Sequence, residues 1–416
     1  MAHAASRREF VASGGLLAAG VATGGFCATA GGFPKNETVH VGVIGAGGRG
    51  TVLLGRLLDL PGVQVTAVCD VYEGHRERAR GLVAGHPSSA GRAPAVFTYH
   101  EDLLARKDVD AVLIGTPDHW HVPCTVAACE AGKDVYVEKP LTHSLEEGAA
   151  VIEAQNRHRR IVQVGTQQRS MPHFRQAKER IAAGALGSIH KIHMTWNRNA
   201  IPIRANAPDV KESQVDWKRF LGAAKPQPFD PYRLLGNWRW FWDFGAGILG
   251  DLMVHWQDSI NYLLDLPLPA SAVTVGDFCA ARGVWETPDT IQTLLHYPDR
   301  GLQAHFEGTF VNQHTRAHLV LMGDAATMIL DRGRCVILPE PRSGAKEETF
   351  GGGVEPPGSD FDKGVDGDAL HLSDWLAAVR ERRPPICPAE AGVLAAAAAH
   401  LGNLAFRERK VATWGK

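Results

Sequence analysis

The chain has 416 residues, of which 44% are hydrophobic, and this is enough apolar material for two well-packed domains. Its formal net charge is −1, so composition does not favour nucleic acid or an anionic membrane surface as a partner. Beyond the N-terminal region no run of eighteen apolar residues occurs, and we predict no membrane-spanning helix in the mature chain. The seven cysteines include no C-x-x-C pair, so neither a zinc site nor a disulfide framework is indicated.

The first thirty residues predict a twin-arginine signal peptide. Arg7 and Arg8 form a basic start, residues 11–26 form a short glycine-rich apolar segment, and residues 28–30 offer an A-x-A cleavage site. Adjacent arginines in this context are similar to the signal of the route that exports folded proteins. We expect a mature protein that starts near Gly31 and lies in the periplasm or is otherwise exported by that route. The alternative is a disordered or amphipathic N-terminal tail.

Residues 36–160 predict a Rossmann dinucleotide-binding domain. A β-branched strand pattern at 38–44 leads into a G-x-G-x-x-G turn at 45–50, and a helical pattern follows at 51–60. Glycines allow the tight turn and let backbone N–H groups approach a pyrophosphate at the helix N-terminus. A non-binding glycine turn is the alternative.

A second strand pattern ends at Asp70, twenty residues after the turn. A carboxylate in this position can accept hydrogen bonds from both ribose hydroxyls and would repel a 2′-phosphate, so NAD is favoured over NADP. Arg49 could weaken that preference by meeting a phosphate.

Two further strand ends are expected in the same crevice. One strand pattern ends before Thr116 and Pro117, with His119 and His121 following, and another ends at the sequence Glu-Lys-Pro around Lys139. Since the carboxyl ends of parallel strands form the ligand crevice, both turns should lie near the nicotinamide end. Burial can lower the pKa of a lysine towards neutrality, which would suit Lys139 to proton transfer.

These segments together resemble the Gfo/Idh/MocA oxidoreductases, a family named for glucose–fructose oxidoreductase and inositol dehydrogenase. The resemblance is carried by "VGVIGAGGRG", "GTPDHWHVPC", "VEKPLTHSLEEG", "VGTQQRS" and "GILGDLMVHWQD". It implies an α/β fold, in which the Rossmann domain precedes an α/β domain with a large, mostly antiparallel sheet at 161–370. One face of that sheet would pack on the first domain and the other would form a homo-oligomer interface. C-terminal helices at 371–416 would pack on the Rossmann domain.

The residues independently support the second domain. β-rich runs separated by turn residues occur at 188–198, 272–281, 290–297, 301–310 and 317–340. Alternation in the run at 302–310 is partial, which is consistent with a sheet packed on both sides. Residues 351–364 predict a glycine-rich loop.

The resemblance also implies catalytic residues. In the family, the lysine of the Glu-Lys-Pro sequence acts with an aspartate and a histidine spaced like Asp251 and His255, which share one face of a predicted helix. Lys139 and His255 would then transfer protons, and Asp251 would orient the substrate or the histidine. The alternative for Asp251 and His255 is a structural pair.

The other predicted site residues fall into two groups. The cofactor contacts are predicted to be Gly45, Gly47, Gly48, Arg49, Gly50, Asp70, Thr116, Pro117, His121, Glu138, Lys139 and Gln167. The substrate contacts are predicted to be Arg169, Trp238, Arg239, Asp243 and Asp258, and the aromatic segment at 237–245 suits sugar stacking, although core packing is an equal alternative for any single tryptophan. We predict no metal, because no motif fixes three ligands, although Asp258 near Asp251 and His255 leaves a metal site as an alternative.

The sequence thus predicts an NAD(P)-dependent oxidoreductase that acts on CH–OH groups of a sugar, cyclitol or related polyol. Because the periplasm offers no comparable pool of free nicotinamide nucleotide, an exported enzyme would carry tightly bound NAD, and each hydride removed must return at the same site. An NAD-dependent glycosidase is the alternative, and a non-enzymatic carbohydrate-binding protein is a third class. Family glycosidases carry a distinct glycine segment with tyrosine and histidine, which is not seen where "WDFGAGILGDLMVHW" stands.

Overall fold

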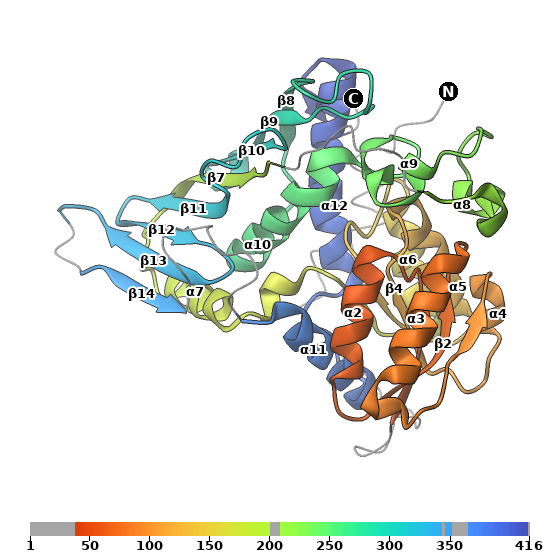
Figure 1. Ribbon diagram of the computed structural model, residues 1–416. Helices are drawn as coiled ribbons and strands as arrows, with labels where there is room; N and C mark the ends of the chain where they lie inside the picture. The colour runs from red at the N-terminus through yellow and green to blue at the C-terminus, as the bar shows by residue number, and fades with distance from the viewer. Residues whose placement is uncertain (1–37, 200–208, 343–345, 352–364, 415–416) are drawn as a thin grey trace.

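The computed structural model describes residues 38–199, 209–342, 346–351 and 365–414. The predicted signal peptide at 1–30 lies outside the described residues, as does nearly all of the predicted loop at 351–364. Figure 1 shows two sheets, one at the lower right and one at the left, with the long helix α12 (Ala389–Glu408) running between them.

The first domain is built on a six-stranded parallel sheet in the order β3-β2-β1-β4-β5-β6. Its strands are β1 (Val39–Ile44), β2 (Val63–Cys69), β3 (Ala95–Phe97), β4 (Ala111–Ile114), β5 (Asp134–Val137) and β6 (Val162–Val164). The intervening helices are α2 (Gly48–Leu58), α3 (Glu73–Gly85), α4 (His100–Leu104), α5 (His121–Glu130) and α6 (Gly148–His158). Separate hydrophobic clusters fill the two faces, which explains why the central strands read as continuous apolar runs. The strand β6 follows the predicted boundary at 160, so this domain extends a few residues further than we predicted.

The second domain carries a nine-stranded sheet in the order β14-β13-β12-β11-β7-β10-β9-β8-β15, in which β7 and β10 form the one parallel pair. Its strands are β7 (Ile189–Asn197), β8 (Ser271–Asp277), β9 (Thr290–Tyr297), β10 (Leu302–Thr309), β11 (Ala317–Gly323), β12 (Ala326–Leu330), β13 (Arg334–Pro339), β14 (Glu348–Gly351) and β15 (Ala412–Thr413). The helices of this part are α7 (Pro172–Ala182), α8 (Trp217–Leu221), α9 (Pro231–Leu234) and α10 (Val254–Leu264).

Within one chain the nine-stranded sheet is packed on one face. Along β9, buried side chains such as Ile291 and Leu295 alternate strictly with exposed ones such as Leu294. The buried face meets α10 and α12, and none of the helices in the described ranges packs on the opposite face. The prediction of packing on both faces is therefore not met within a single chain.

The two C-terminal helices join the domains. Helix α11 (Gly367–Glu381) packs Leu372 and Trp375 into the cluster between the first sheet and α2. Helix α12 contacts α6 and β6 of the first domain as well as α10 and β8 of the second. Of the helices in the described ranges, α12 is the one long and apolar enough to cross a membrane, but 72% of its apolar window is buried inside the protein.

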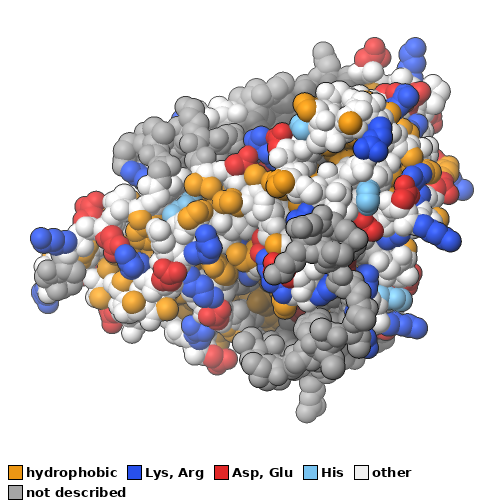
Figure 2. Space-filling model, turned by 90° about the horizontal axis from the view of Figure 1, so that it is seen from below, with side chains coloured by type: hydrophobic (Ala, Val, Ile, Leu, Met, Phe, Trp, Pro, Cys, Tyr) orange, Lys and Arg blue, Asp and Glu red, His pale blue; other side chains and the backbone are white. Residues whose placement is uncertain are grey.

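The described residues carry charges of both signs on the side of the molecule that is viewed from below. Figure 2, which views the molecule from below, shows acidic and basic side chains interspersed over that side. The described cysteines are free thiols, of which Cys279 is exposed and the others are buried.

A buried ion pair fastens α10 to the chain just after β6. The guanidinium of Arg169 donates two hydrogen bonds to Asp258, at 2.7 and 2.8 Å, and the Asp258 side chain is fully buried. Both residues had been predicted to contact the substrate. The structure instead turns each side chain towards the other, away from the cavity between the domains, which corrects that prediction.

Replacing Arg169 by Met should lower the free energy of unfolding by about 3–5 kcal/mol, because it leaves a carboxylate buried without its counter-charge. The double variant Arg169→Met with Asp258→Asn should recover part of that loss. The exposed pair of Arg80 and Glu77 supplies the control, since Arg80→Met should change stability by no more than about 0.5 kcal/mol. Urea unfolding of the three variants measures this, and equal losses for Arg169→Met and Arg80→Met would contradict the role of the buried pair.

Candidate active site

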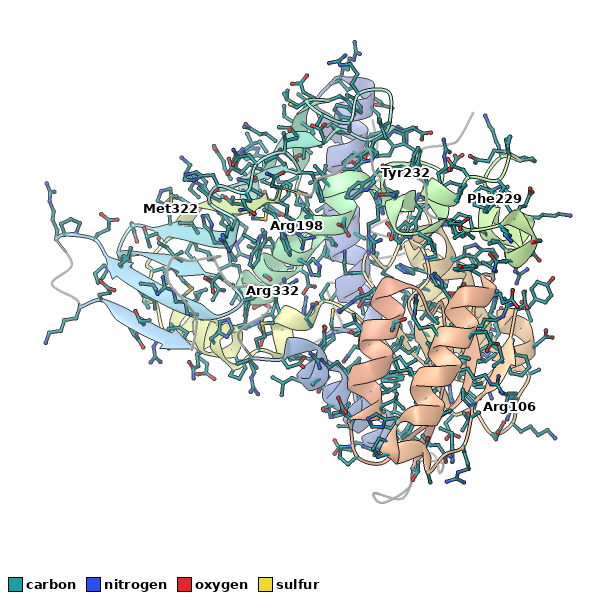
Figure 3. All side chains as sticks on the ribbon, in the orientation of Figure 1. Arg106, Arg198, Phe229, Tyr232, Met322 and Arg332 are labelled. Atoms are coloured by element: carbon teal, nitrogen blue, oxygen red, sulfur yellow. The ribbon has the colours of Figure 1, made fainter. Side chains whose placement is uncertain are left out.

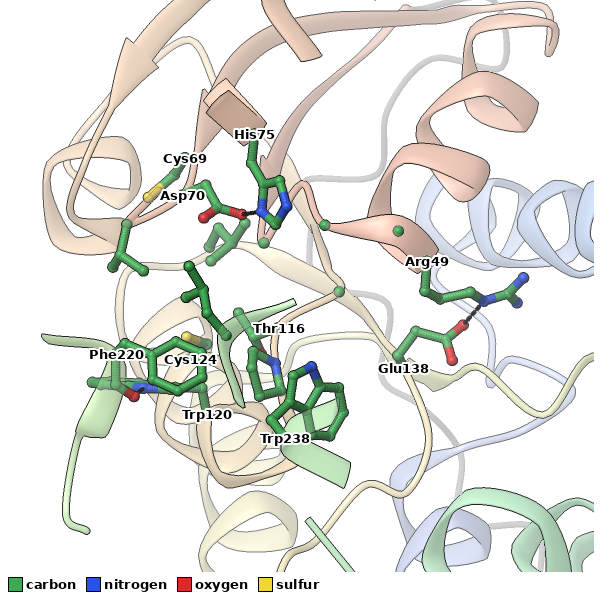
Figure 4. A pocket seen from close by; sticks show the side chains of 18 of the residues that line it. Arg49, Cys69, Asp70, His75, Thr116, Trp120, Cys124, Glu138, Phe220 and Trp238 are labelled. Carbon is green, nitrogen blue, oxygen red and sulfur yellow. Dashed lines mark hydrogen bonds and ion pairs between the residues drawn. The ribbon is translucent and has the colours of Figure 1, made fainter. Parts of the chain in front are cut away.

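A cavity of about 370 Å³ lies at the carboxyl ends of the first-domain strands and is closed on its outer side by residues of the second domain. Figure 4 shows that Arg49 and Glu138 lie at one end of it, whereas Cys124, Trp120 and Phe220 lie at the other. Most of the predicted cofactor contacts line this cavity, namely Gly45, Gly47, Gly48, Arg49, Asp70, Thr116, Pro117, His121, Glu138 and Lys139.

The glycine turn fits a dinucleotide. Gly45 has φ +83°, and a Cβ there would lie 2.5 Å from the backbone nitrogen of Thr116. Gly50 does not line the cavity, but a Cβ on it would lie 2.0 Å from the carbonyl oxygen of Gly45, so it allows helix and strand to pack closely. A Cβ on Gly48 would meet nothing within 4 Å, and this open space faces the N-terminus of α2, where a pyrophosphate would be bound.

Asp70 is held at the end of β2 by the turn itself. One carboxylate oxygen accepts a hydrogen bond from the backbone nitrogen of Ala46 at 2.9 Å and lies 3.1 Å from Nδ1 of His75. The other accepts from the backbone nitrogen of Tyr72 at 2.9 Å. The carboxylate is thus fixed beside the cavity in the position expected for a ribose-binding acid.

Arg49 belongs to a buried ion network instead of pointing freely at a phosphate. Its Nε donates to Glu138 at 2.9 Å, and its two terminal nitrogens each donate to Asp368 at 2.7 Å. The network therefore joins the glycine turn, the end of β5 and α11. Asp368 had not been predicted, since no local pattern connects it with a residue more than 300 positions away.

Lys139 and Asp251 form the contact between the domains at the reactive end of the cavity. The Lys139 ammonium donates to a carboxylate oxygen of Asp251 at 2.9 Å and to its backbone oxygen at 2.6 Å, and Arg239 donates to the same carboxylate at 3.1 Å. Burial alone would raise the pKa of Asp251, but the charges of Lys139 and Arg239 outweigh it and hold the pKa well below its ordinary value. Asp251 therefore stays ionised and holds the ammonium in place.

The segment that carries Asp251 is not a regular α-helix. Residues Leu249–Met253 form a π-helical turn, η6, that leads directly into α10. The four-residue spacing of Asp251 and His255 had predicted one α-helical face, whereas the wider turn rotates Asp251 relative to the helix that follows. Such turns are often found at functional sites.

His255 is buried and, like Asp251, lies outside the cavity lining, where it is held neutral. Its Nδ1 lies 3.2 Å from Oε1 of Gln168, and its ring stacks on Trp196 with centroids 5.3 Å apart. An amide oxygen can only accept, so Nδ1 carries the proton and Nε2 keeps the lone pair. Burial, then the charges of Lys139 and Arg332, hold the pKa of His255 well below 6.5.

Two further cations contact Trp196, the residue that stacks on the His255 ring. Arg198 and Arg332 lie towards the middle of the molecule in Figure 3, and their guanidinium carbons lie 5.4 and 5.2 Å from the centroid of Trp196. The second-domain sheet thus presents positive charge beside His255.

Of the remaining predicted residues, two line the cavity and two do not. Trp238 and Arg239 line the cavity, and the Arg239 guanidinium lies 4.1 Å from the Trp238 ring centroid. Asp243 is exposed and contacts Gln227, and Gln167 is buried; neither lines the cavity.

The histidines after β4 are held by backbone carbonyl oxygens. His121 lies between two backbone carbonyl oxygens, of Pro140 and Thr116, and burial lowers its pKa to about 4. Nε2 of His119 donates to the carbonyl of Phe220 over 2.8 Å. Across the described ranges, no group of three or more His, Cys, Asp or Glu side chains is arranged to hold a metal ion.

Fold and site together define a two-domain α/β protein that binds a nicotinamide dinucleotide. Two domain models of one family match the chain: the oxidoreductase family with an NAD-binding Rossmann fold at residues 39–166, and the GFO/IDH/MocA C-terminal domain at residues 219–329. Together they span more than half of it, and the chain belongs to the Gfo/Idh/MocA family.

Curated relatives match over a shorter length. A glycosyl hydrolase family 109 protein of Saccharopolyspora erythraea is 40% identical over 130 residues, which are 31% of this chain and 28% of the relative. An α-N-acetylgalactosaminidase of Shewanella oneidensis is 31% identical over 176 residues, which are 37% of this chain and 38% of the relative. The chain thus spans about a third of the length of these relatives.

Solved structures share the whole fold at low identity. A levoglucosan dehydrogenase in complex with NADH and levoglucosan superposes with a TM-score of 0.70 at 18% identity, covering 91% of this chain and 100% of the other. An aldose-aldose oxidoreductase from Caulobacter crescentus in complex with glycerol gives 0.67 at 18% identity, with coverage of 91% and 100%. These similarities establish the architecture.

The depressed pKa of His255 should be visible in the pH dependence of turnover. A base is lost as pH falls through its pKa, so the acid limb of kcat/KM should lie well below pH 6.5. Arg332→Met removes a positive charge near the ring and should move this limb upwards, whereas Arg342→Met, at an exposed position, should not. An acid limb at pH 6.5 in the unmodified protein would contradict His255 as the buried base.

Proposed function

We propose that the protein is an NAD-dependent oxidoreductase that acts on a secondary hydroxyl of a sugar, cyclitol or related polyol. The observation that carries this proposal is the Lys139 ammonium, held by Asp251 at the end of β5 beside the dinucleotide cavity, with the neutral base His255 on the same segment as Asp251. The second-domain cavity wall adds Trp238 and Arg239, an aromatic face and a hydrogen-bond donor of the kind that sugars require.

The residues present can perform this oxidation. When bound, the nicotinamide accepts the hydride that leaves the carbinol carbon. His255 takes the hydroxyl proton at Nε2, and the Lys139 ammonium polarises the same oxygen as it becomes a carbonyl. Asp251 stays ionised throughout and keeps the ammonium oriented.

The relatives named as glycosidases favour a second candidate, an NAD-dependent glycoside hydrolase. Transient oxidation of a ring hydroxyl acidifies the adjacent C–H, so that a base can remove that proton while the glycosidic oxygen leaves. Water then adds to the double bond and the hydride returns, so the reaction is redox-neutral. The same Lys139, Asp251 and His255 would serve both reactions.

Aryl glycosides and free sugars, incubated with the purified protein, distinguish the two. Release of aglycone without net cofactor reduction supports the glycosidase, and a keto-sugar or reduced cofactor supports the oxidoreductase. Lys139→Met should lower either rate by about 10²–10⁴-fold while nucleotide stays bound, whereas Lys410→Met, at an exposed position just after α12, should leave the rate unchanged. Failure to turn over any member of both panels, with NAD bound, would instead leave a carbohydrate-binding protein.

We further propose that the protein crosses the membrane folded, through the twin-arginine route, with NAD enclosed. The pair Arg7 and Arg8 motivates this, and a cofactor without an external pool must be held at about nanomolar affinity or better. Mass spectrometry of the nucleotide released on denaturing the exported protein should find NAD in preference to NADP, as the carboxylate of Asp70 requires. Export of an Arg7→Lys, Arg8→Lys variant at the unmodified level, or exported protein without nucleotide, would contradict the proposal.

The open face of the nine-stranded sheet is the surface through which we propose a homo-oligomer. Val273 and Val275 of β8 and Leu294 of β9 are exposed there, with 66% of Val275 accessible. Covering such a face would remove apolar surface from water. A monomeric mass in light scattering would contradict this assembly.

A further inference from the structure

One end of the dinucleotide cavity is walled by a short helix of the second domain. Beyond Asp70, the lining passes to His100, Trp120 and Cys124 of the first domain and then to Arg219 and Phe220 of α8. Figure 4 shows Trp120, Cys124 and Phe220 grouped at this end, on the far side of Thr116 from Arg49. In a Rossmann fold the adenine lies beyond the ribose-binding acid at the end of β2, so this end of the cavity is the place for an adenine ring.

Helix α8 is fastened to the first domain before it reaches the cavity. Asp216, its N-cap, donates its backbone N–H to the carbonyl of Val71 at 3.1 Å, directly after Asp70. The Asp216 carboxylate accepts from the backbone of Arg219 at 2.9 Å and from the Tyr99 hydroxyl at 2.9 Å. One side chain therefore caps the helix and ties it to the loop after β3.

Arg219 closes the gap between the two domains. Its guanidinium carbon lies 4.9 Å from the Trp120 ring centroid and 5.6 Å from that of Tyr99. One terminal nitrogen contacts the carboxylate of Glu101 and also lies 3.2 Å from Nδ1 of His100. A planar cation is thus held over aromatic faces at the cavity wall.

The end of α8 is bound to the turn after β4 as well. The carbonyl of Phe220 accepts the indole N–H of Trp120 at 3.0 Å. Gly222 then turns the chain away with φ +59°, and a Cβ there would lie within 3.1 Å of the Trp120 indole. Both aromatic walls of this end are consequently fixed in position.

We infer that α8 forms a latch over the adenine subsite, in which Trp120, Arg219 and Phe220 enclose the adenine and slow the escape of the nucleotide. Indole, phenyl and guanidinium faces are the surfaces on which nucleobases stack. The inference rests on the proposed function only in that the nucleotide is NAD. Because the latch would contact only the adenosine half of NAD, its loss should weaken the binding of NAD but not the binding of a nucleotide without adenosine.

The test compares NAD with nicotinamide mononucleotide, which lacks the adenosine half, on the full chain stripped of nucleotide and reloaded. Arg219→Ala should speed the release of labelled NAD and weaken its binding by about tenfold or more, and leave the affinity for nicotinamide mononucleotide unchanged. Tyr99→Phe, at an exposed position outside the cavity lining, removes one of the hydrogen bonds to the Asp216 carboxylate and should speed NAD release to a smaller extent. Lys218→Ala, on the exposed side of the same helix, is the matched control and should release NAD at the unmodified rate.

NAD release at the unmodified rate from both Arg219→Ala and Tyr99→Phe would overturn the latch. An equal loss of affinity for NAD and nicotinamide mononucleotide would overturn it too, because it would reveal a general disturbance of the cavity. Neither result tests catalysis, because the chemical step is tested by the turnover rate of the Lys139→Met variant. Conversely, a protein that shows the latch effect but turns over no sugar or glycoside would sink the proposed function and leave the latch intact.

Discussion

The ion pair between Lys139 and Asp251 is the contact on which the arrangement of the site depends. It joins the end of a first-domain strand to a π-helical turn of the second domain, so neither domain alone contains the catalytic residues that we propose. Removing both charges from water is costly, and the compensation comes from close geometry and from a second cation, Arg239, on the same carboxylate. The pair fixes the distance between the dinucleotide cavity and the helix that carries His255.

The positive charge around this pair also sets the protonation states. Lys139, Arg332 and Arg198 all oppose protonation of His255, and burial adds to their effect. Lys139, Arg239 and Arg198 keep Asp251 ionised. Asp251 is held as a carboxylate and Lys139 as an ammonium. The group of the three that can accept a proton is therefore the neutral imidazole of His255, at Nε2. Trp196 lies between these groups, since it stacks on the imidazole and contacts the guanidinium groups of Arg198 and Arg332.

Features that depend on neighbours in sequence could be predicted, and features that depend on distant partners could not. The strand at 290–297 matched the structure residue for residue because its period of two is local, and the glycine turn with Asp70 is likewise contained within one βαβ unit. Arg169 and Asp258, by contrast, satisfy each other across 89 positions, and a charged residue near a predicted site gives no local sign of such a partner. The π-helical turn escaped prediction for a related reason: the spacing of Asp251 and His255 fits an α-helix equally well. Helix α8 was also missed, although the aromatic and basic residues of "DWKRFLG" were a visible signal, because nothing local shows that they meet Trp120.

The enclosure of the two ends of the cavity by different parts of the second domain has a consequence for a retained cofactor. Trp238 and Arg239 line the end at which we propose that substrate enters and leaves in every cycle, whereas α8 lines the end at which we place the adenine, where nothing would need to move once the nucleotide is bound. Helix α8 is anchored by hydrogen bonds at the carbonyls of Val71 and Phe220 and by an exposed ion pair with Glu101, and the proposed latch would slow opening there without restricting the substrate side. A closed redox cycle needs this asymmetry, because an enzyme that returns each hydride to the same nicotinamide gains nothing from exchanging its nucleotide and loses activity whenever it does.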